Sequence, residues 1–236
     1  MIELLQQYWK PLLWTDGYHI TGLAMTLWLL VASVVIGFLV SVPLSVARVS
    51  ERRWLRWPIG FYTYVFRGTP LYLQLLICYT GIYSLGFVRD QPLLGSFFRD
   101  GLNCTILAFA LNTCAYTTEI FAGAIRNTPH GEVEAAKAYG LDGWRLYVHV
   151  ILPSALRRSL PFYSNEVIMM LHSTTLAFTA TVPDLLKIAR DANTATFLTF
   201  QAFGLAALMY LAVSFILIGL FRLAERRWLA FLGPTH

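Results

Sequence analysis

Polar side chains that could bind a solute occur inside long apolar stretches of this sequence. In one of these stretches, Asn112, Tyr116 and Glu119 are spaced by four and three residues, so they lie along one face of a helix. Such a face could line a path for a polar solute, or it could join helices through hydrogen bonds that need no solute. For Glu119 we favour the structural role, with Arg126 or Arg67 as the partner of its carboxylate.

A second polar group lies further along the chain, at Asn165, Glu166, His172 and Thr174. Asn165 and His172 are two helical turns apart and share a face, with Glu166 beside it. A carboxyl group buried alone is protonated or paired with a cation, so Glu166 could pair with a cationic solute. These side chains would suit a cavity for an amino acid, and the alternative is that they pack between subunits.

The composition is that of an integral membrane protein. Hydrophobic residues make up 57% of the 236 residues and charged residues only 13%, whereas soluble domains carry about 25% charged residues. The mean hydropathy is +0.57.

We expect no metal, cofactor or catalytic site: Cys78, Cys104 and Cys114 form no metal-type pair, and no phosphate-binding loop occurs. The net charge of +5 falls in short clusters at the ends of apolar stretches, which argues against a nucleic-acid partner.

A membrane span needs about 20 apolar residues, and five stretches of the chain meet this need. We therefore expect one all-α membrane domain over residues 1–236. The second stretch is too long for a perpendicular crossing, so it is tilted, interrupted at Gly68-Thr69-Pro70, or partly interfacial. The loops Arg89–Asp100 and Asp184–Asp191 are expected to face outward. The five expected spans are 21–47, 58–87, 103–125, 160–182 and 200–220.

Lysine and arginine are unequally distributed between the two sides of this arrangement. Cytoplasmic segments next to spans are enriched in these residues, so we expect the N-terminus outside and the C-terminus in the cytoplasm. The richer side carries twelve of the 18 basic residues: Arg48, Arg52, Arg53, Arg56, Arg126, Lys137, Arg145, Arg157, Arg158, Arg222, Arg226 and Arg227. The other side carries Lys10, Arg89, Arg99, Lys187 and Arg190.

The loop 126–157 between the third and fourth spans is polar and predicts two short helices. Thr128-Pro129 can start the first helix, and Gly140 suits the left-handed residue that ends it. A turn follows at 141–143, and a second helix is expected over Trp144–Ile151, stopped by Pro153. This cytoplasmic helix–turn–helix is placed to contact another protein.

The same loop resembles the conserved loop of ABC-importer permease subunits. That pattern is Glu-Ala-Ala, a glycine four residues later, then nine residues, an aliphatic residue, one residue and Leu-Pro, and Val150 stands where the family usually has isoleucine. The resemblance implies the permease fold of type I importers, in which this loop forms a coupling helix seated in a cleft of the ATPase. It implies the ATPase-coupling residues Glu134, Ala135, Ala136, Gly140, Leu152 and Pro153.

Three further stretches, 66–75, 115–125 and 164–185, resemble permeases for polar amino acids, most closely the M-type subunits of bacterial importers for histidine, lysine, arginine and ornithine. Many relatives have lysine where this chain has His172. The resemblance implies a subunit of the bacterial inner membrane with a periplasmic N-terminus. Its implied partners are a second homologous permease, an ABC ATPase dimer that binds ATP-Mg, a periplasmic binding protein and a basic amino acid. Alternatives are a permease for another polar amino acid or a stand-alone secondary transporter; a membrane enzyme lacks support because no catalytic pattern occurs.

Overall fold

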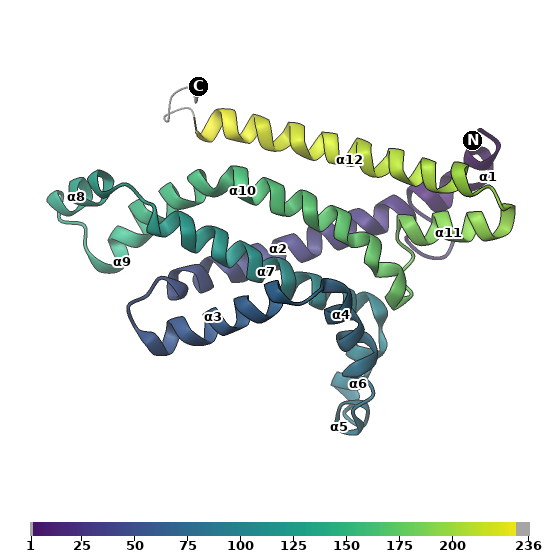
Figure 1. Cartoon of the computed structure of the whole chain (residues 1–236), viewed down its shortest axis with the longest axis horizontal. Coiled ribbons are helices and arrows are strands. Elements are labelled where there is room, and N and C mark those ends of the chain that lie inside the picture. Colours follow the sequence, from purple (N-terminus) through teal and green to yellow (C-terminus); the bar gives the residue numbers. More distant parts are fainter. Residues whose placement is uncertain (1, 230–236) are drawn as a thin grey trace.

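The computed structural model describes residues 2–229, and side chains from residue 6 onward. Residue 1 and residues 230–236, and with them the ends of the expected domain, lie outside the described part. The described chain is helical, without a β-strand, and its helices run largely parallel or antiparallel (Figure 1). The helices are α1 (Ile2–Leu13), α2 (Gly22–Arg48), α3 (Arg53–Gly68), α4 (Leu71–Leu76), α5 (Gly86–Arg89), α6 (Pro92–Arg99), α7 (Gly101–Arg126), α8 (His130–Ala138), α9 (Gly143–Leu146), α10 (Leu152–Ser173), α11 (Leu185–Thr196) and α12 (Thr199–Trp228). Three short segments extend neighbouring helices: the π-helical turns Ile77–Gly81 and Tyr147–Ile151 and the 3-10 helix Thr174–Ala180.

Helices occupy all five stretches that the sequence predicts to be spans. α2, α7 and α12 cover the first, third and fifth, and α10 with its 3-10 extension covers the fourth. The second stretch is interrupted where Gly68 ends α3 and Pro70 precedes α4, which was one of the expected possibilities. Of the described helices, α2 and α12 are each long and apolar enough to cross a membrane on their own.

A line of small residues lets α2 approach α7 closely. Ser33, Gly37, Ser41 and Ser45 recur every four residues on α2, and all four are buried. A Cβ atom on Gly37 would lie 2.5 Å from the Cγ2 atom of Thr113 and 3.3 Å from the backbone nitrogen of Cys114, both on α7, so a larger residue would have to displace Thr113. This is the small-residue packing that membrane helices use in place of a hydrophobic driving force.

An ion pair joins α2, α3 and α7 near the end of the bundle that carries α8. The Glu119 carboxylate accepts hydrogen bonds from Arg48 Nε and from Thr63 Oγ1, each at 2.7 Å. The structural role expected for Glu119 is therefore present. The expected partners, Arg126 and Arg67, were wrong, because Arg48 is 71 residues away in sequence and only the fold brings it close.

The two ends of the bundle differ in charge. The α2–α3 connection, α8, α9 and the C-terminal end of α12 gather at one end, while α1 and α11 lie at the other (Figure 1). The segments richest in arginine thus share one end. At the opposite end, the expected outward loop Asp184–Asp191 is instead helix α11, and fully buried Asp184 caps it by accepting hydrogen bonds from the amides of Leu186 and Lys187.

Candidate functional site

The helix predicted from Thr128-Pro129 forms as α8 and ends in a left-handed glycine. Gly140 has φ +79°, and its amide donates to the Lys137 carbonyl at 2.9 Å. The Leu141 amide donates to the Ala136 carbonyl at 3.0 Å. These two bonds form the Schellman termination, which satisfies the last carbonyls of a helix and favours glycine at the left-handed position.

One face of α8 packs on the bundle and the other is open. Ala136, only 7% exposed, sits in an apolar cluster with Ile125 and Leu146. Glu134 and Ala135 are exposed. The open side of this loop therefore carries part of the Glu-Ala-Ala pattern, while Ala136 serves to attach α8 to the bundle.

Two aromatic side chains that sequence reasoning did not single out are exposed in the same loop, one at the end of α8 and one in α9. Tyr139 is 89% exposed and Trp144 is 73% exposed. Large exposed aromatics are unfavourable in water and are enriched at the centres of protein interfaces. Aromatic residues in an otherwise polar loop are the sequence feature that could have indicated this contact surface.

The expected stop at Pro153 is wrong. After Gly143, helix α9 passes through the π-helical turn Tyr147–Ile151 directly into α10, and Pro153 occupies the first turn of α10. Proline has no amide to donate, and the π-helical turn before it accommodates this gap in the hydrogen-bond ladder. Leu152 packs against the same apolar cluster as Ala136.

A carboxylate fastens α8 to the start of α10. Glu132 accepts a hydrogen bond from Ser154 Oγ at 2.6 Å and pairs with Arg158 Nη2 at 2.6 Å. The Ser154 hydrogen bond and then the Arg158 charge hold the pKa of Glu132 below its usual value. These contacts tie α8 directly to the first turns of α10.

A polar cavity lies between α3, α7 and α10 and has a volume of about 670 Å³. It brings together four of the six residues proposed for a substrate path: Asn112, Tyr116, Asn165 and Glu166. Arg67 at the end of α3 lines the same cavity. The volume lies within the range of about 300–1,000 Å³ that is common for small-molecule sites.

Hydrogen bonds hold the cavity's polar residues in place. Glu166 accepts from Thr113 Oγ1 at 3.0 Å, and Asn112 Nδ2 donates to Gln74 Oε1 at 3.0 Å. The Tyr116 hydroxyl donates to the Arg67 carbonyl at 3.3 Å.

Arg67 is the residue of this cavity that sequence reasoning left out of the substrate path. Its guanidinium lies over the Tyr116 ring, 5.3 Å from the centroid. The cavity thus carries one fixed cation, Arg67, and one carboxyl group, Glu166. The sequence feature that could have indicated Arg67 is its position directly before the Gly68-Thr69-Pro70 break, where α3 ends.

The other two path candidates lie outside this cavity. His172 contacts Ser214 of α12, with 3.3 Å between Nε2 and Oγ. Thr174 is fully buried, donates to the Leu171 carbonyl at 2.6 Å and lies 3.4 Å from the Tyr210 hydroxyl. In the described conformation both contribute to helix packing.

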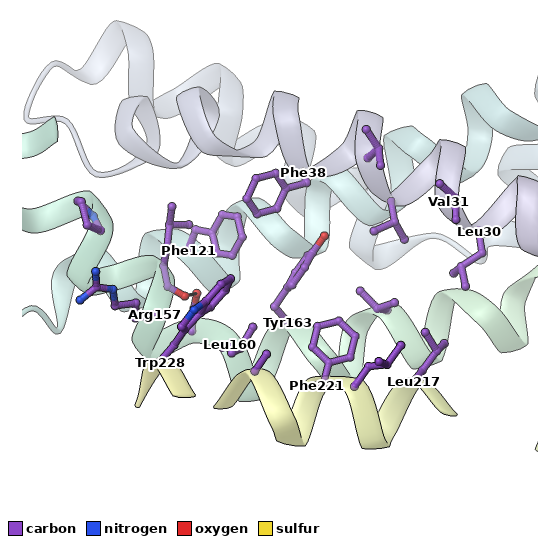
Figure 2. Close-up of a pocket in the computed structure, with 18 residues that line it drawn as sticks. Leu30, Val31, Phe38, Phe121, Arg157, Leu160, Tyr163, Leu217, Phe221 and Trp228 are labelled. Atoms are coloured by element: carbon purple, nitrogen blue, oxygen red, sulfur yellow. Dashed lines mark hydrogen bonds between the residues drawn. The ribbon is translucent and has the colours of Figure 1, made fainter. Parts of the chain in front are cut away.

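A larger cavity of about 930 Å³ lies between α2, α10 and α12 (Figure 2). Its lining is almost entirely aliphatic and aromatic, so it offers few partners for a polar solute. Within the described residues, no cluster of three or more His, Cys, Asp or Glu side chains could hold a metal ion.

Comparisons with known proteins agree on one kind of protein. Residues 33–230 match the family described as "Binding-protein-dependent transport system inner membrane component". The histidine/lysine/arginine/ornithine transport system permease protein HisM of Salmonella typhimurium is 66% identical over 97% of both chains. HisM of Escherichia coli K12 is 63% identical over 100% of this chain and 99% of its own. The octopine transport system permease OccM of Rhizobium radiobacter is 40% identical, covering 87% of this chain and 84% of its own.

Solved structures agree as well. A chain from a crystal structure of an amino acid ABC transporter with histidines superposes with a TM-score of 0.76 at 30% identity, covering 87% of this chain and 92% of that one. A chain of the inward-facing MetNI methionine ABC transporter superposes with a TM-score of 0.68 at 16% identity, covering 95% and 97%. The second likeness concerns the fold alone.

Proposed function

Because the chain belongs to the family of binding-protein-dependent transport system inner membrane components and is an ABC transporter permease, we propose that it imports basic amino acids such as histidine, lysine, arginine and ornithine. The observation that carries this proposal is the polar cavity in which Arg67 and Glu166 face a common space. The close relatives named for these four substrates support it.

The two charged groups of the cavity match the two ends of a basic amino acid. The Arg67 guanidinium can pair with the substrate's α-carboxylate, because a planar fork of donors fits a carboxylate. The Glu166 carboxylate can receive the cationic side chain. Asn112 and Asn165 offer amide groups to the polar remainder of the substrate.

Substrate selectivity of a Glu166→Gln variant tests this assignment. Removing the carboxylate should lower uptake of arginine about thirtyfold or more, since losing one member of a close charge pair costs about 2 kcal/mol or more. Uptake of citrulline, a neutral analogue of arginine, should change little. Glu119→Gln is the control, because that carboxylate binds Arg48 outside the cavity and should affect both substrates alike. An equal loss for arginine and citrulline in Glu166→Gln would remove Glu166 from the substrate site and favour a permease for another polar amino acid.

For coupling, the proposal is that the open face of α8, with Glu134, Ala135 and the exposed rings of Tyr139 and Trp144, docks on an ABC ATPase dimer that binds ATP-Mg. A second homologous permease would complete the membrane part, and a periplasmic binding protein would deliver the substrate. Ala135 is the position for a crosslinker, because it is exposed and Ala136 is buried. A crosslinker at Ala135 that never captures a nucleotide-hydrolysing chain in cells would contradict this docking and favour a stand-alone transporter.

For topology, the proposal is five spans, formed by α2, α3 with α4, α7, α10 with its 3-10 extension, and α12. The end with α8 would be cytoplasmic and the end with α1 periplasmic. The gathering of arginines at the α8 end supports this orientation. An impermeant maleimide should label Tyr18→Cys in spheroplasts but reach Arg53→Cys, an exposed position at the α8 end outside the proposed ATPase contact, only after lysis. The reverse pattern would invert the topology. All three native cysteines are buried and should give little background.

A further inference from the structure

The apolar cavity between α2, α10 and α12 has no role in amino-acid transport as described above. Each helix lines it with one continuous face. On α12 the lining residues begin at Leu217 and end at Trp228, and on α10 they begin at Pro153 and include Leu156, Arg157 and Leu160. From Leu217 to Trp228 the cavity extends about 16 Å at 1.5 Å per residue. This is close to half of the roughly 30 Å hydrocarbon core of a bilayer.

We propose that this cavity binds one anionic phospholipid, with an acyl chain between α2 and α12 and the phosphate on Arg157. The lipid would belong to the leaflet on the α8 side, which is cytoplasmic in the proposed topology. The volume of about 930 Å³ lies in the upper part of the range for ligand sites. The apolar lining suits an acyl chain and excludes a polar solute.

The charged and aromatic groups lie at one end of the cavity. Figure 2 shows Arg157 and Trp228 at this end and Val31, Leu30 and Leu217 at the other. Arg157 is exposed, and no other described residue engages its guanidinium in a hydrogen bond or ion pair. Basic groups at the mouth of such a cavity attract anionic head groups, and tryptophan is enriched at the level of the lipid head groups.

Lipid retained by the purified complete transporter tests the proposal. The complex is equilibrated with vesicles of phosphatidylglycerol and phosphatidylethanolamine, washed in detergent, and its bound lipids are measured by mass spectrometry. Wild type should retain phosphatidylglycerol in preference to phosphatidylethanolamine. Arg157→Gln should lower the affinity for phosphatidylglycerol about fivefold, the equivalent of about 1 kcal/mol for one basic residue near the surface. Arg53→Gln is the charge-matched control, because Arg53 is exposed at the same end but does not line the cavity.

A second variant fills the cavity instead of removing its charge. Val35 lines the cavity and is 49% exposed, so tryptophan at this position can enter the open space without displacing the core. Val35→Trp should lose the retained lipid, whereas Val40→Trp, at a 46% exposed position of α2 outside the cavity, should keep it.

Three results would overturn the proposal. They are equal phosphatidylglycerol retention in variants and controls, no preference over phosphatidylethanolamine in wild type, or a photocrosslink from Leu220 in the cavity wall to a second permease subunit in place of lipid. The readout is bound lipid and not uptake, so a failure here would leave the proposed transport function standing.

Discussion

The left-handed backbone of Gly140 makes its replacement the most direct test of coupling through α8. A Cβ atom added to Gly140 would have no heavy atom within 4 Å, so substitution creates no clash. The cost comes only from φ +79°, which an L-residue adopts with a penalty of about 1–2 kcal/mol. Asparagine tolerates this conformation best and a β-branched residue worst.

A penalty of this size is small beside the 5–15 kcal/mol that stabilise a folded domain. Membrane insertion should therefore survive in Gly140→Val. The same penalty reduces the population of the correctly ended helix about fivefold to thirtyfold, since 1.4 kcal/mol is a factor of ten. We expect ATP hydrolysis to continue while substrate uptake per ATP falls by a similar factor, because α8 no longer holds one orientation in the ATPase.

The assay is uptake and ATP hydrolysis by the complete transporter in proteoliposomes, corrected for the amount of permease. We expect the order glycine, asparagine, alanine, valine at position 140 for uptake per ATP. Gly131→Ala is the control, because Gly131 lies within α8, has no positive φ and also has open space around its Cα. Equal uptake by the valine and asparagine variants, or equal damage from Gly131→Ala, would refute the argument from backbone conformation.

Two further predictions concern the links between helices. Glu132→Gln should weaken the attachment of α8 to α10 by about 1 kcal/mol, the upper value for a partly exposed ion pair with Arg158. Uptake per ATP should fall while membrane abundance stays the same. Unchanged uptake per ATP would mean that the ion pair does not transmit movement. Because the folded pKa of Glu132 lies below its ordinary value of 4.5, this stabilisation is present above about pH 4.5 and is lost as the pH falls through the folded pKa. In thermal denaturation, the loss of stability on acidification should be smaller in Glu132→Gln than in wild type. Gly37→Leu should separate α2 from α7 by pressing on Thr113, so we expect lower membrane abundance by immunoblot, with Gly37→Ala affected less; normal abundance of the leucine variant would contradict the close approach.

Local features of this chain could be predicted from sequence, and contacts between distant segments could not. Gly140 was predicted as a left-handed helix end because that conformation depends on neighbouring residues alone. The stop at Pro153 was wrong because a π-helical turn before it lets the chain remain helical. The Arg48 partner of Glu119 depends on how α2 packs on α7, and nothing local specifies it.

The polar cavity was predicted in part for a geometric reason. Asn165 and Glu166 are about 100° apart on α10 and both border the cavity, with Met169 and Ser173 between them. His172 lies about 20° from Asn165 around α10 and about 10 Å further along it, and there it contacts Ser214 of α12 instead of the cavity. Heptad spacing identifies residues on a shared face, but the boundary of a cavity is set by the neighbouring helices.

The contacts of α10 indicate how a movement of α8 could reach the substrate cavity. The Glu132–Arg158 ion pair fixes α8 to the first turns of α10, and Glu166 lies on the same helix, about 12 Å beyond Arg158 at 1.5 Å per residue. Pro161 lies between them and is where a helix bends most readily. Glu119 fastens α7 to α2 and α3, so two further helices hold α7 in place although Ile125 of α7 also contacts Ala136 of α8. A displacement of α10 against α7 must therefore strain the hydrogen bond of Thr113 to Glu166, and a carboxylate released there would be free to take or surrender a cationic side chain.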